Sequence, residues 1–335
     1  MRLLILGGTI FLGRHLAEAA LQGGHEVTLF HRGRHNPHLF PKATHLHGDR
    51  DGDLHALAAG EWDAVVDTSG YLPRLVRDSA RLLSGRVGHY TFVSSISVYR
   101  DPAARDVDET APLVALEDQS TEQLTAETYG PLKALCEQAA EGELPGRTLI
   151  VRPGLIVGPH DLSDRFTYWP RRVTHGGSIL APGRPGRSVQ IIDVRDLAAW
   201  LLVMSTTGRT GVYNATGPEK PLTMEEVLET CREASDSVGE FVWVTDEFLL
   251  RHGVVPFTEM PLWIPHAEDR IDCRRAIRAG LAFRPLRKTA WETVAWDLSR
   301  PPGTELRAGL GADREIALLQ AWRGETSPSP EQGPN

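Results

Sequence analysis

The stretch LILGGTIFLG, residues 4–13, decides the fold of this chain. An apolar run stops at Gly7 and Gly8, and a third glycine, Gly13, follows five residues later. A turn from a strand into a helix needs glycine where φ is positive, where a phosphate approaches closely, and where the helix packs on the strand. The following helix offers its N-terminal N–H groups to phosphate. The stretch therefore predicts a dinucleotide-binding turn, although Ile10 stands where a middle glycine is usual.

Beyond this turn, short apolar runs alternate with helical patterns through the first half of the chain. The predicted helices include GRHLAEAALQGG and YGPLKALCEQAAE. The predicted strands are RLLILG, HEVTLFHRG, THLHGD, WDAVVDTSG, GHYTFVSSISVY and RTLIVRPGLIVGP. Strands and helices in this alternation form βαβ units, and right-handed crossovers join them into a doubly wound parallel sheet. We therefore expect an α/β protein of the Rossmann type with a smaller C-terminal α/β domain.

The second half has a more mixed pattern, which sets the expected domain boundaries. VQIIDVRDLAAWLLV and GVYNATG indicate a return to the first domain, and Thr223 with Glu226 forms a predicted capping box for a helix. The polar, proline-rich end of the chain is expected to be disordered. The expected parts are a Rossmann domain over 1–158 with a return segment at about 188–217, a substrate-binding part over 159–187 and 218–325, and a tail over 326–335.

Composition narrows the classes of function. The chain has 335 residues, 41% of them hydrophobic, and a formal net charge of −8, which disfavours a general nucleic-acid binder. The three cysteines are widely spaced without a CxxC pair, so neither a zinc site nor a disulfide framework is expected. The sequence has no HExxH motif, so a catalytic metal is not expected. No apolar run approaches the ~18 residues of a membrane span, and we expect a cytoplasmic protein.

Several motifs in order carry a resemblance to a known family: GGTIFLGRHL, SSISVY, YGPLK, RPGLIVGP, IIDVRDLA and VYNATG. Together they resemble the extended and atypical short-chain dehydrogenase/reductases, the group labelled NAD-dependent epimerase/dehydratase. Gly7 and Gly13 match the first and last glycines of the family's GxxGxxG pattern, and Ile10 departs from the middle one. The GGTxFxG variant looks like an atypical branch, which includes proteins similar to chloroplast RNA-binding members.

The end of the second strand indicates which nicotinamide cofactor is bound. An NAD enzyme usually places an acidic residue there for the ribose 2′-hydroxyl, but this chain has His31 followed by Arg32 and Arg34. A guanidinium can hold a 2′-phosphate with two hydrogen bonds, so we expect NADP rather than NAD, with Arg32 as the leading contact. The alternative is a solvated basic loop. The remaining expected cofactor contacts are Gly7, Thr9, Ile10, Phe11, Leu12, Gly13, Asp49, Arg50, Thr68, Ser69, Gly70, Lys133 and Pro153.

Tyr129 and Lys133 are the predicted catalytic pair. They stand four residues apart at the start of a helix, so they share one face. A lysine ammonium nearby favours the phenolate and lowers the tyrosine pKa from its ordinary value near ~10. The resemblance puts Ser95 at the family's catalytic serine or threonine, where it orients the substrate oxygen. The alternative is an ordinary pair on a helix surface.

The resemblance also points to the substrate and the reaction. It places a pocket after the sixth strand, and the expected substrate contacts are Tyr71, Ser97, Tyr168, Trp169 and Arg172. The alternative is that Trp169 belongs to the core and that the arginines of this segment are solvated. Sugar 4,6-dehydratases of this family carry an Asp-Glu pair where this chain has Ile96 and Ser97, so a dehydratase is disfavoured.

The expected function is an NADP-dependent reductase that acts on a small-molecule carbonyl by hydride transfer. A nucleotide-sugar 4-epimerase with the same site is one alternative, and a non-catalytic or RNA-binding Rossmann protein is another. The expected partner is a small-molecule substrate, with neither a nucleic acid nor a membrane, and a homodimer is plausible by analogy with the family.

Overall fold

The computed structural model describes residues 1–101, 106–266 and 271–326. These residues divide into two compact units. The first unit comprises the described residues of 1–160, 190–221 and 271–284, and the second comprises 161–189, 222–266 and 285–326. The expected substrate-binding part includes all of 218–325, whereas the structure places 218–221 and 271–284 in the first unit. Residues 327–335 of the predicted tail lie outside the described residues, and Thr326 ends a helix.

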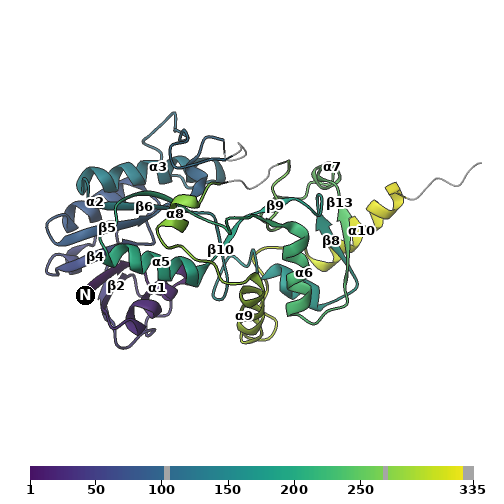
Figure 1. The fold of residues 1–335 in the computed structure, drawn as a ribbon, viewed down its shortest axis with the longest axis horizontal. Coiled ribbons are helices and arrows are strands. Elements are labelled where there is room, and N and C mark those ends of the chain that lie inside the picture. The colour runs from purple at the N-terminus through teal and green to yellow at the C-terminus, as the bar shows by residue number, and fades with distance from the viewer. Residues whose placement is uncertain (102–105, 267–270, 327–335) are drawn as a thin grey trace, which may run out of the picture. The chain divides into compact units, whose positions relative to one another are not determined.

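A seven-stranded sheet forms the centre of the first unit (Figure 1). Its order is β11-β6-β5-β4-β1-β2-β3, with all neighbours parallel. The chain runs outward from β1 in one direction and from β4 in the other, so their carboxyl ends flank the switch point at which open α/β sheets bind ligands. The strands are β1 (Arg2–Leu6), β2 (Glu26–His31), β3 (Thr44–His47), β4 (Trp62–Asp67), β5 (Val87–Val93), β6 (Thr148–Pro153) and β11 (Gly211–Ala215).

Helices cover both faces of this sheet, which explains the nearly continuous apolar strands. Successive β1 side chains point to opposite faces. Leu3 and Ile5 belong to the core with α1 and α5, and Leu4 and Leu6 belong to the core with α2 and α3. The helices are α1 (Phe11–Gln22), α2 (Pro73–Leu83), α3 (Ala126–Glu143) and α5 (Val194–Thr206).

Helix α3 begins earlier than predicted. The expected start at Tyr129 places Pro131 in the first turn, but the helix begins at Ala126, so Pro131 lies in the second turn. The reason is a capping box, in which the Thr125 side chain accepts from the Thr128 N–H and the Thr128 side chain accepts from the Thr125 N–H.

Shorter elements complete the first unit. β7 (Leu155–Val157) pairs with β10 (Ile191–Asp193), and the Asp193 side chain caps α5 by accepting from the Arg195 N–H. The others are the 3₁₀ helices η1 (His55–Leu57) and η2 (Ile96–Val98), and α8 (Arg274–Arg278).

The second unit has two small sheets and five helices among its described residues. The predicted capping box of Thr223 and Glu226 starts α6. One sheet pairs β8 (Ser178–Pro182) with β13 (Glu240–Val244), and the other pairs β9 (Ser188–Val189) with β12 (Leu222–Thr223). The helices are α4 (Tyr168–Thr174), α6 (Met224–Ala234), α7 (Asp246–Arg251), α9 (Leu286–Leu298) and α10 (Ala312–Thr326).

Within the described ranges, no helix has the length and apolar character that a bilayer span needs. The same residues contain no cluster of three or more histidine, cysteine or acidic side chains arranged for a metal ion. Cys136, Cys231 and Cys273 are buried and unpaired.

Candidate dinucleotide and acid–base site

The glycine turn leads from β1 into α1. Gly7 and Gly8 have φ of +111° and +97°, a region that side chains rarely adopt. A Cβ on Gly13 would lie 2.6 Å from the Gly8 nitrogen, so Gly13 permits close packing of helix on turn. A Cβ on Gly8 would lie 2.6 Å from the Leu29 side chain. Glycine is therefore needed at position 8 for its positive φ and for close packing on Leu29 of β2, whether or not a ligand also approaches it.

Ile10 occupies the position of the missing glycine without strain. Its φ of −132° is ordinary extended backbone, and its side chain is 38% exposed. Positive φ falls instead on the next residue, Phe11, at 35°. No side chain caps the N-terminus of α1, which leaves the positive end of the helix dipole open to an anion. This cradle fits the pyrophosphate of a dinucleotide.

The predicted lining residues support the turn from below. The hydroxyls of Thr68 and Ser69 donate to the Leu6 carbonyl at 3.0 and 3.1 Å, and a Cβ on Gly7 would meet the Thr68 Oγ1 at 2.6 Å. The Asn36 side chain donates to the Thr9 carbonyl at 2.9 Å. These bonds hold β1, β4 and the segment after β2 together at the switch point. Leu12 belongs to the core, and Pro153 ends β6 in a buried position.

Arg32 and Arg34 follow β2 with exposed side chains, as a phosphate-binding segment requires. Arg32 lies 3.9 Å from Asp49, and this distance joins its Nη1 to a carboxylate oxygen. The two residues thus share the ribose end of the predicted site.

The structure corrects the assignment of Arg50. Its guanidinium donates to both Asp67 carboxylate oxygens at 2.6 and 2.8 Å and to the Ser79 hydroxyl at 2.7 Å. Asp67 is fully buried and also accepts from the Tyr90 hydroxyl at 2.8 Å. The Arg50 guanidinium is therefore bound by internal partners and is not the cofactor contact that the sequence suggests. Sequence reasoning missed Asp67, whose signal is a carboxylate at the end of an apolar strand.

Lys133 is held in a buried position at the carboxyl edge of the sheet. Its Nζ donates to the carbonyls of Gly70 at 2.6 Å and Val93 at 2.7 Å, and the residue is 3% exposed. The ammonium lies 4.2 Å from the centre of the Phe92 ring and 5.4 Å from that of Tyr71. Burial lowers the pKa of Lys133 to about 8. An ammonium has three protons, so two backbone bonds leave one for a further partner.

The structure brings the other predicted catalytic residues to the same edge. Helix α3 packs against η2, and a Cβ on Gly130 would lie 2.0 Å from the Ser97 carbonyl oxygen. The rings of Tyr129 and Tyr71 lie 6.5 Å apart. Ser95 directly precedes η2, and its Oγ accepts from the Ser97 N–H and donates to the Ser97 Oγ at 3.0 Å. Ser97 and Tyr71 are exposed here, as a substrate contact requires.

A buried ion pair that sequence reasoning missed lies one turn beyond Lys133. Glu137 accepts from Arg152 at 2.9 and 2.7 Å, and from the Ser94 hydroxyl at 2.5 Å. Arg152 also donates to the Tyr99 hydroxyl at 3.0 Å. The signal in the sequence is the spacing of Tyr129, Lys133 and Glu137, which repeats every four residues along one face of α3.

The three predicted substrate contacts in the second unit have internal roles. Trp169 is fully buried and donates to the Pro261 carbonyl at 3.0 Å. Tyr168 is buried, and its ring makes a T-shaped contact with the ring of Trp169. Arg172 donates to the buried Glu315 at 2.5 Å and to the Ser178 carbonyl at 2.8 Å. We therefore keep only Tyr71 and Ser97 as candidate substrate contacts.

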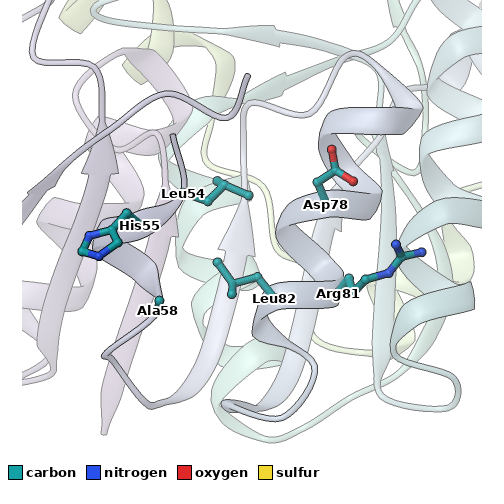
Figure 2. Close-up of a pocket in the computed structure, with 6 residues that line it drawn as sticks. All are labelled: Leu54, His55, Ala58, Asp78, Arg81 and Leu82. Atoms are coloured by element: carbon teal, nitrogen blue, oxygen red, sulfur yellow. The ribbon is translucent and has the colours of Figure 1, made fainter. Parts of the chain in front are cut away.

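A separate hollow of about 390 Å³ lies between η1 and α2 (Figure 2). Because α2 runs antiparallel to the strands, its later residues lie toward their amino ends, away from the glycine turn. The hollow therefore belongs to the opposite end of the sheet from the candidate site. Its lining residues are Leu54, His55, Ala58, Asp78, Arg81 and Leu82.

Comparison with known proteins gives one curated relative and many similar structures. No family model matches the chain. The relative, chloroplast stem-loop binding protein of 41 kDa b from Arabidopsis thaliana, is 27% identical over 252 residues, which cover 70% of this chain and 63% of the relative. The chain thus matches less than two thirds of that relative's length.

Two solved structures illustrate the likeness in fold. UDP-glucuronic acid 4-epimerase from Bacillus cereus, in complex with NAD, is 13% identical with a TM-score of 0.66, over 88% of this chain and 96% of that one. Human epimerase family protein SDR39U1, with NADPH, is 21% identical with a TM-score of 0.61, over 88% of this chain and 99% of that one. The expected Rossmann-type α/β fold is confirmed.

Proposed function

We propose that this protein is an NAD(P)-dependent oxidoreductase or epimerase of the extended short-chain dehydrogenase/reductase type. One observation carries the proposal. A glycine turn that enters an uncapped helix lies at the same sheet edge as Ser95, Tyr129 and the fixed ammonium of Lys133. The first feature fits a dinucleotide and the second fits proton transfer to a carbonyl oxygen.

Each residue group then has a chemical task. The nicotinamide, when bound, supplies or accepts the hydride. The glycine turn and the start of α1 hold the pyrophosphate. Ser95 orients the substrate oxygen, and Tyr129 exchanges a proton with it. Lys133, fixed by two carbonyls, directs its remaining proton toward the ribose hydroxyls or the tyrosine and favours the phenolate.

We favour NADP and a reductase over NAD and an epimerase. Exposed Arg32 and Arg34 offer guanidinium groups to a 2′-phosphate. The residue at the end of β2 is His31, where an NAD enzyme usually has an acidic residue. Asp49 near Arg32 weakens this preference and makes Arg34 a necessary second contact. An epimerase with the same site would return the hydride to its substrate and so recycle its cofactor, and the epimerase of similar fold from Bacillus cereus is in complex with NAD.

A different class of function has one observation in its favour. The curated relative is named as a stem-loop binding protein, so RNA binding is the second candidate. Its affinity would fall steeply with salt, because phosphate contacts release counterions. The net charge of −8 opposes this candidate.

The decisive experiment measures turnover on a panel of ketones and aldehydes by the absorbance of NADPH. We expect turnover by the wild-type protein and a loss of about 100-fold or more in Tyr129→Phe. Tyr213→Phe, which alters a tyrosine packed on Trp200, is the matched control and should keep its activity. Full turnover by Tyr129→Phe would refute the proton-transfer role. No turnover at all, with salt-dependent binding of a stem-loop RNA, would favour the second candidate.

A further inference from the structure

Three histidines gather beside the start of the basic segment: His31 ends β2, His47 ends β3, and His45 lies two residues earlier in β3. The ring centres of His31 and His47 are 4.9 Å apart, and those of His31 and His45 are 5.1 Å apart. His31 is 8% exposed, and both of its ring nitrogens have partners. Its Nδ1 lies 3.0 Å from the Gly33 nitrogen and its Nε2 lies 2.8 Å from the His45 Nδ1. The His45 Nε2 lies 3.2 Å from the Phe40 carbonyl oxygen.

The partners at the two ends of this chain fix the tautomers. The Gly33 N–H can only donate, so the His31 Nδ1 is an acceptor and carries no proton. The His31 Nε2 then carries the proton and donates to the His45 Nδ1. The His45 Nε2 in turn donates to the Phe40 carbonyl. Both rings are therefore neutral, and one additional proton would leave two donors facing each other.

This relay closes a segment of chain, residues 33–40, at both ends. Gly33 has φ of +71°, and a Cβ there would lie 3.1 Å from the His47 Nδ1, so the segment turns tightly against the histidines. Within it, Asn36 donates to the Thr9 carbonyl in the glycine turn. The relay thus sets the path of the backbone that carries Arg34 and follows Arg32.

We propose that His31 and His45 are positioning residues for the cofactor's 2′-phosphate, and that they hold Arg32 and Arg34 in place only while both rings are neutral. His31 itself has no donor left for a ribose hydroxyl. This inference rests on the proposed NADP-binding function and extends it to a pair of residues that do not touch the cofactor.

Burial and the neighbouring histidines oppose the protonation of His31. Burial, followed by the nearby His45 and His47 of β3, lowers the pKa of His31. Arg32 beside it adds a further positive group, which Asp49 partly offsets at 3.9 Å. Acid that protonates the pair breaks the Gly33 or His45 bond and loosens the segment, so phosphate affinity should fall. A histidine that bound the phosphate directly would instead gain affinity on protonation.

The first test reads the rings in the protein without cofactor, so it does not depend on the proposed function. Histidine ring nitrogens are observed by ¹⁵N NMR in the full-length protein. We expect an unprotonated Nδ1 on both His31 and His45 at neutral pH, and a His31 that titrates below the ordinary value of about 6.5. A protonated His31 Nδ1, or an ordinary titration of that ring, would overturn the relay.

The second test measures NADPH and NADH affinity by calorimetry at about pH 7.5 and about pH 5.5. His45→Phe removes the acceptor and should weaken NADPH binding by about tenfold with little change for NADH, whereas His45→Asn, which retains an acceptor oxygen, should restore it. His31→Asn can still accept from the Gly33 N–H and should show a smaller loss in acid than the wild type. His38→Asn, at an exposed histidine of the same segment, should behave as the wild type.

The outcomes separate the two proposals. Equal NADPH affinity in His45→Phe and the wild type, or equal acid losses in the wild type and His31→Asn, would overturn the positioning role while the NADP-binding function stands. Comparing the acid losses of the wild type and His31→Asn also cancels the effect of phosphate protonation, because both proteins bind the same cofactor. If neither the wild type nor any variant binds either dinucleotide while the NMR relay is intact, the proposed function fails and the positioning role fails with it.

Discussion

Gly13 is the residue at which the glycine turn tolerates a side chain least. A Cβ there would meet backbone atoms, the Gly8 nitrogen at 2.6 Å and the Gly8 Cα at 2.9 Å, and backbone cannot move aside as a flexible side chain can. We expect Gly13→Ala to lower the free energy of unfolding by about 1–3 kcal/mol and to weaken dinucleotide binding. Urea unfolding and calorimetry measure the two effects.

Gly85→Ala is the matched control for this change. A Cβ on Gly85 meets nothing within 4 Å, so its effect on stability should stay within about 0.5 kcal/mol. Equal stability of the two variants would contradict the assigned packing role of Gly13.

Lys133 gives the protein a distinctive dependence of stability on pH. Burial lowers its pKa from 10.5 to about 8 in the folded protein. Between these values the unfolded chain binds more protons than the folded one, so the free energy of unfolding rises with pH. Relative to Lys133→Met, the wild type should gain about 2 kcal/mol between pH 7 and pH 9.5. Urea unfolding of both proteins measures this difference. A difference that stays constant with pH would show that folding does not lower the pKa of Lys133.

At the scale of the element, α3 is fixed to the sheet by a polar stripe. Removing the Glu137 carboxylate would leave the Arg152 guanidinium buried without its partner. We expect Glu137→Leu to cost about 3–5 kcal/mol in unfolding free energy, and Glu137→Leu combined with Arg152→Met to recover most of that loss. Gln138→Leu, at an exposed neighbouring position, should change stability by under about 0.5 kcal/mol. An unchanged stability in Glu137→Leu would show that the pair does not anchor the helix.

The strands of the first unit were predictable as elements because each apolar run is flanked by glycine or polar residues. The start of α3 was less so. Its N-terminus depends on a threonine at Thr128 that accepts from the Thr125 N–H, where the capping pattern sought in the sequence has Glu or Gln. The same pattern with Glu226 marked the start of α6 correctly. Local hydrogen bonding with the expected residue type is visible in a sequence, and an unusual partner is not.

At the scale of the whole molecule, the sequence identified polar residues near the site but not which of them were already paired. The partner of Arg50 stands 17 residues away and that of Arg172 stands 143 residues away. Such pairs form only when the chain folds, so both arginines had the appearance of ligand contacts. The return of 271–284 to the first unit has the same cause. The Gln190 side-chain amide donates to the Ile271 carbonyl and accepts from the Ile271 N–H, 81 residues away.

The net charge of −8 also bears on the whole molecule, because an anionic cofactor must be held by local groups against this background. We propose that the glycine turn, the start of α1 and the segment with Arg32 and Arg34 perform that task. Arg32→Ala combined with Arg34→Ala should therefore remove the preference for NADPH while retaining NADH binding. Parallel calorimetric titrations of the double variant check this expectation, and a preserved preference would place the phosphate contact elsewhere.

The most direct measurement is a calorimetric titration of the full-length protein with NADPH and with NADH. We expect both dinucleotides to bind with a stoichiometry of about one per chain, and NADPH to bind at least about tenfold more tightly than NADH. If neither dinucleotide binds, this sheet edge is not a nicotinamide-cofactor site. If NADH binds more tightly than NADPH, the role given to Arg32 and Arg34 is wrong.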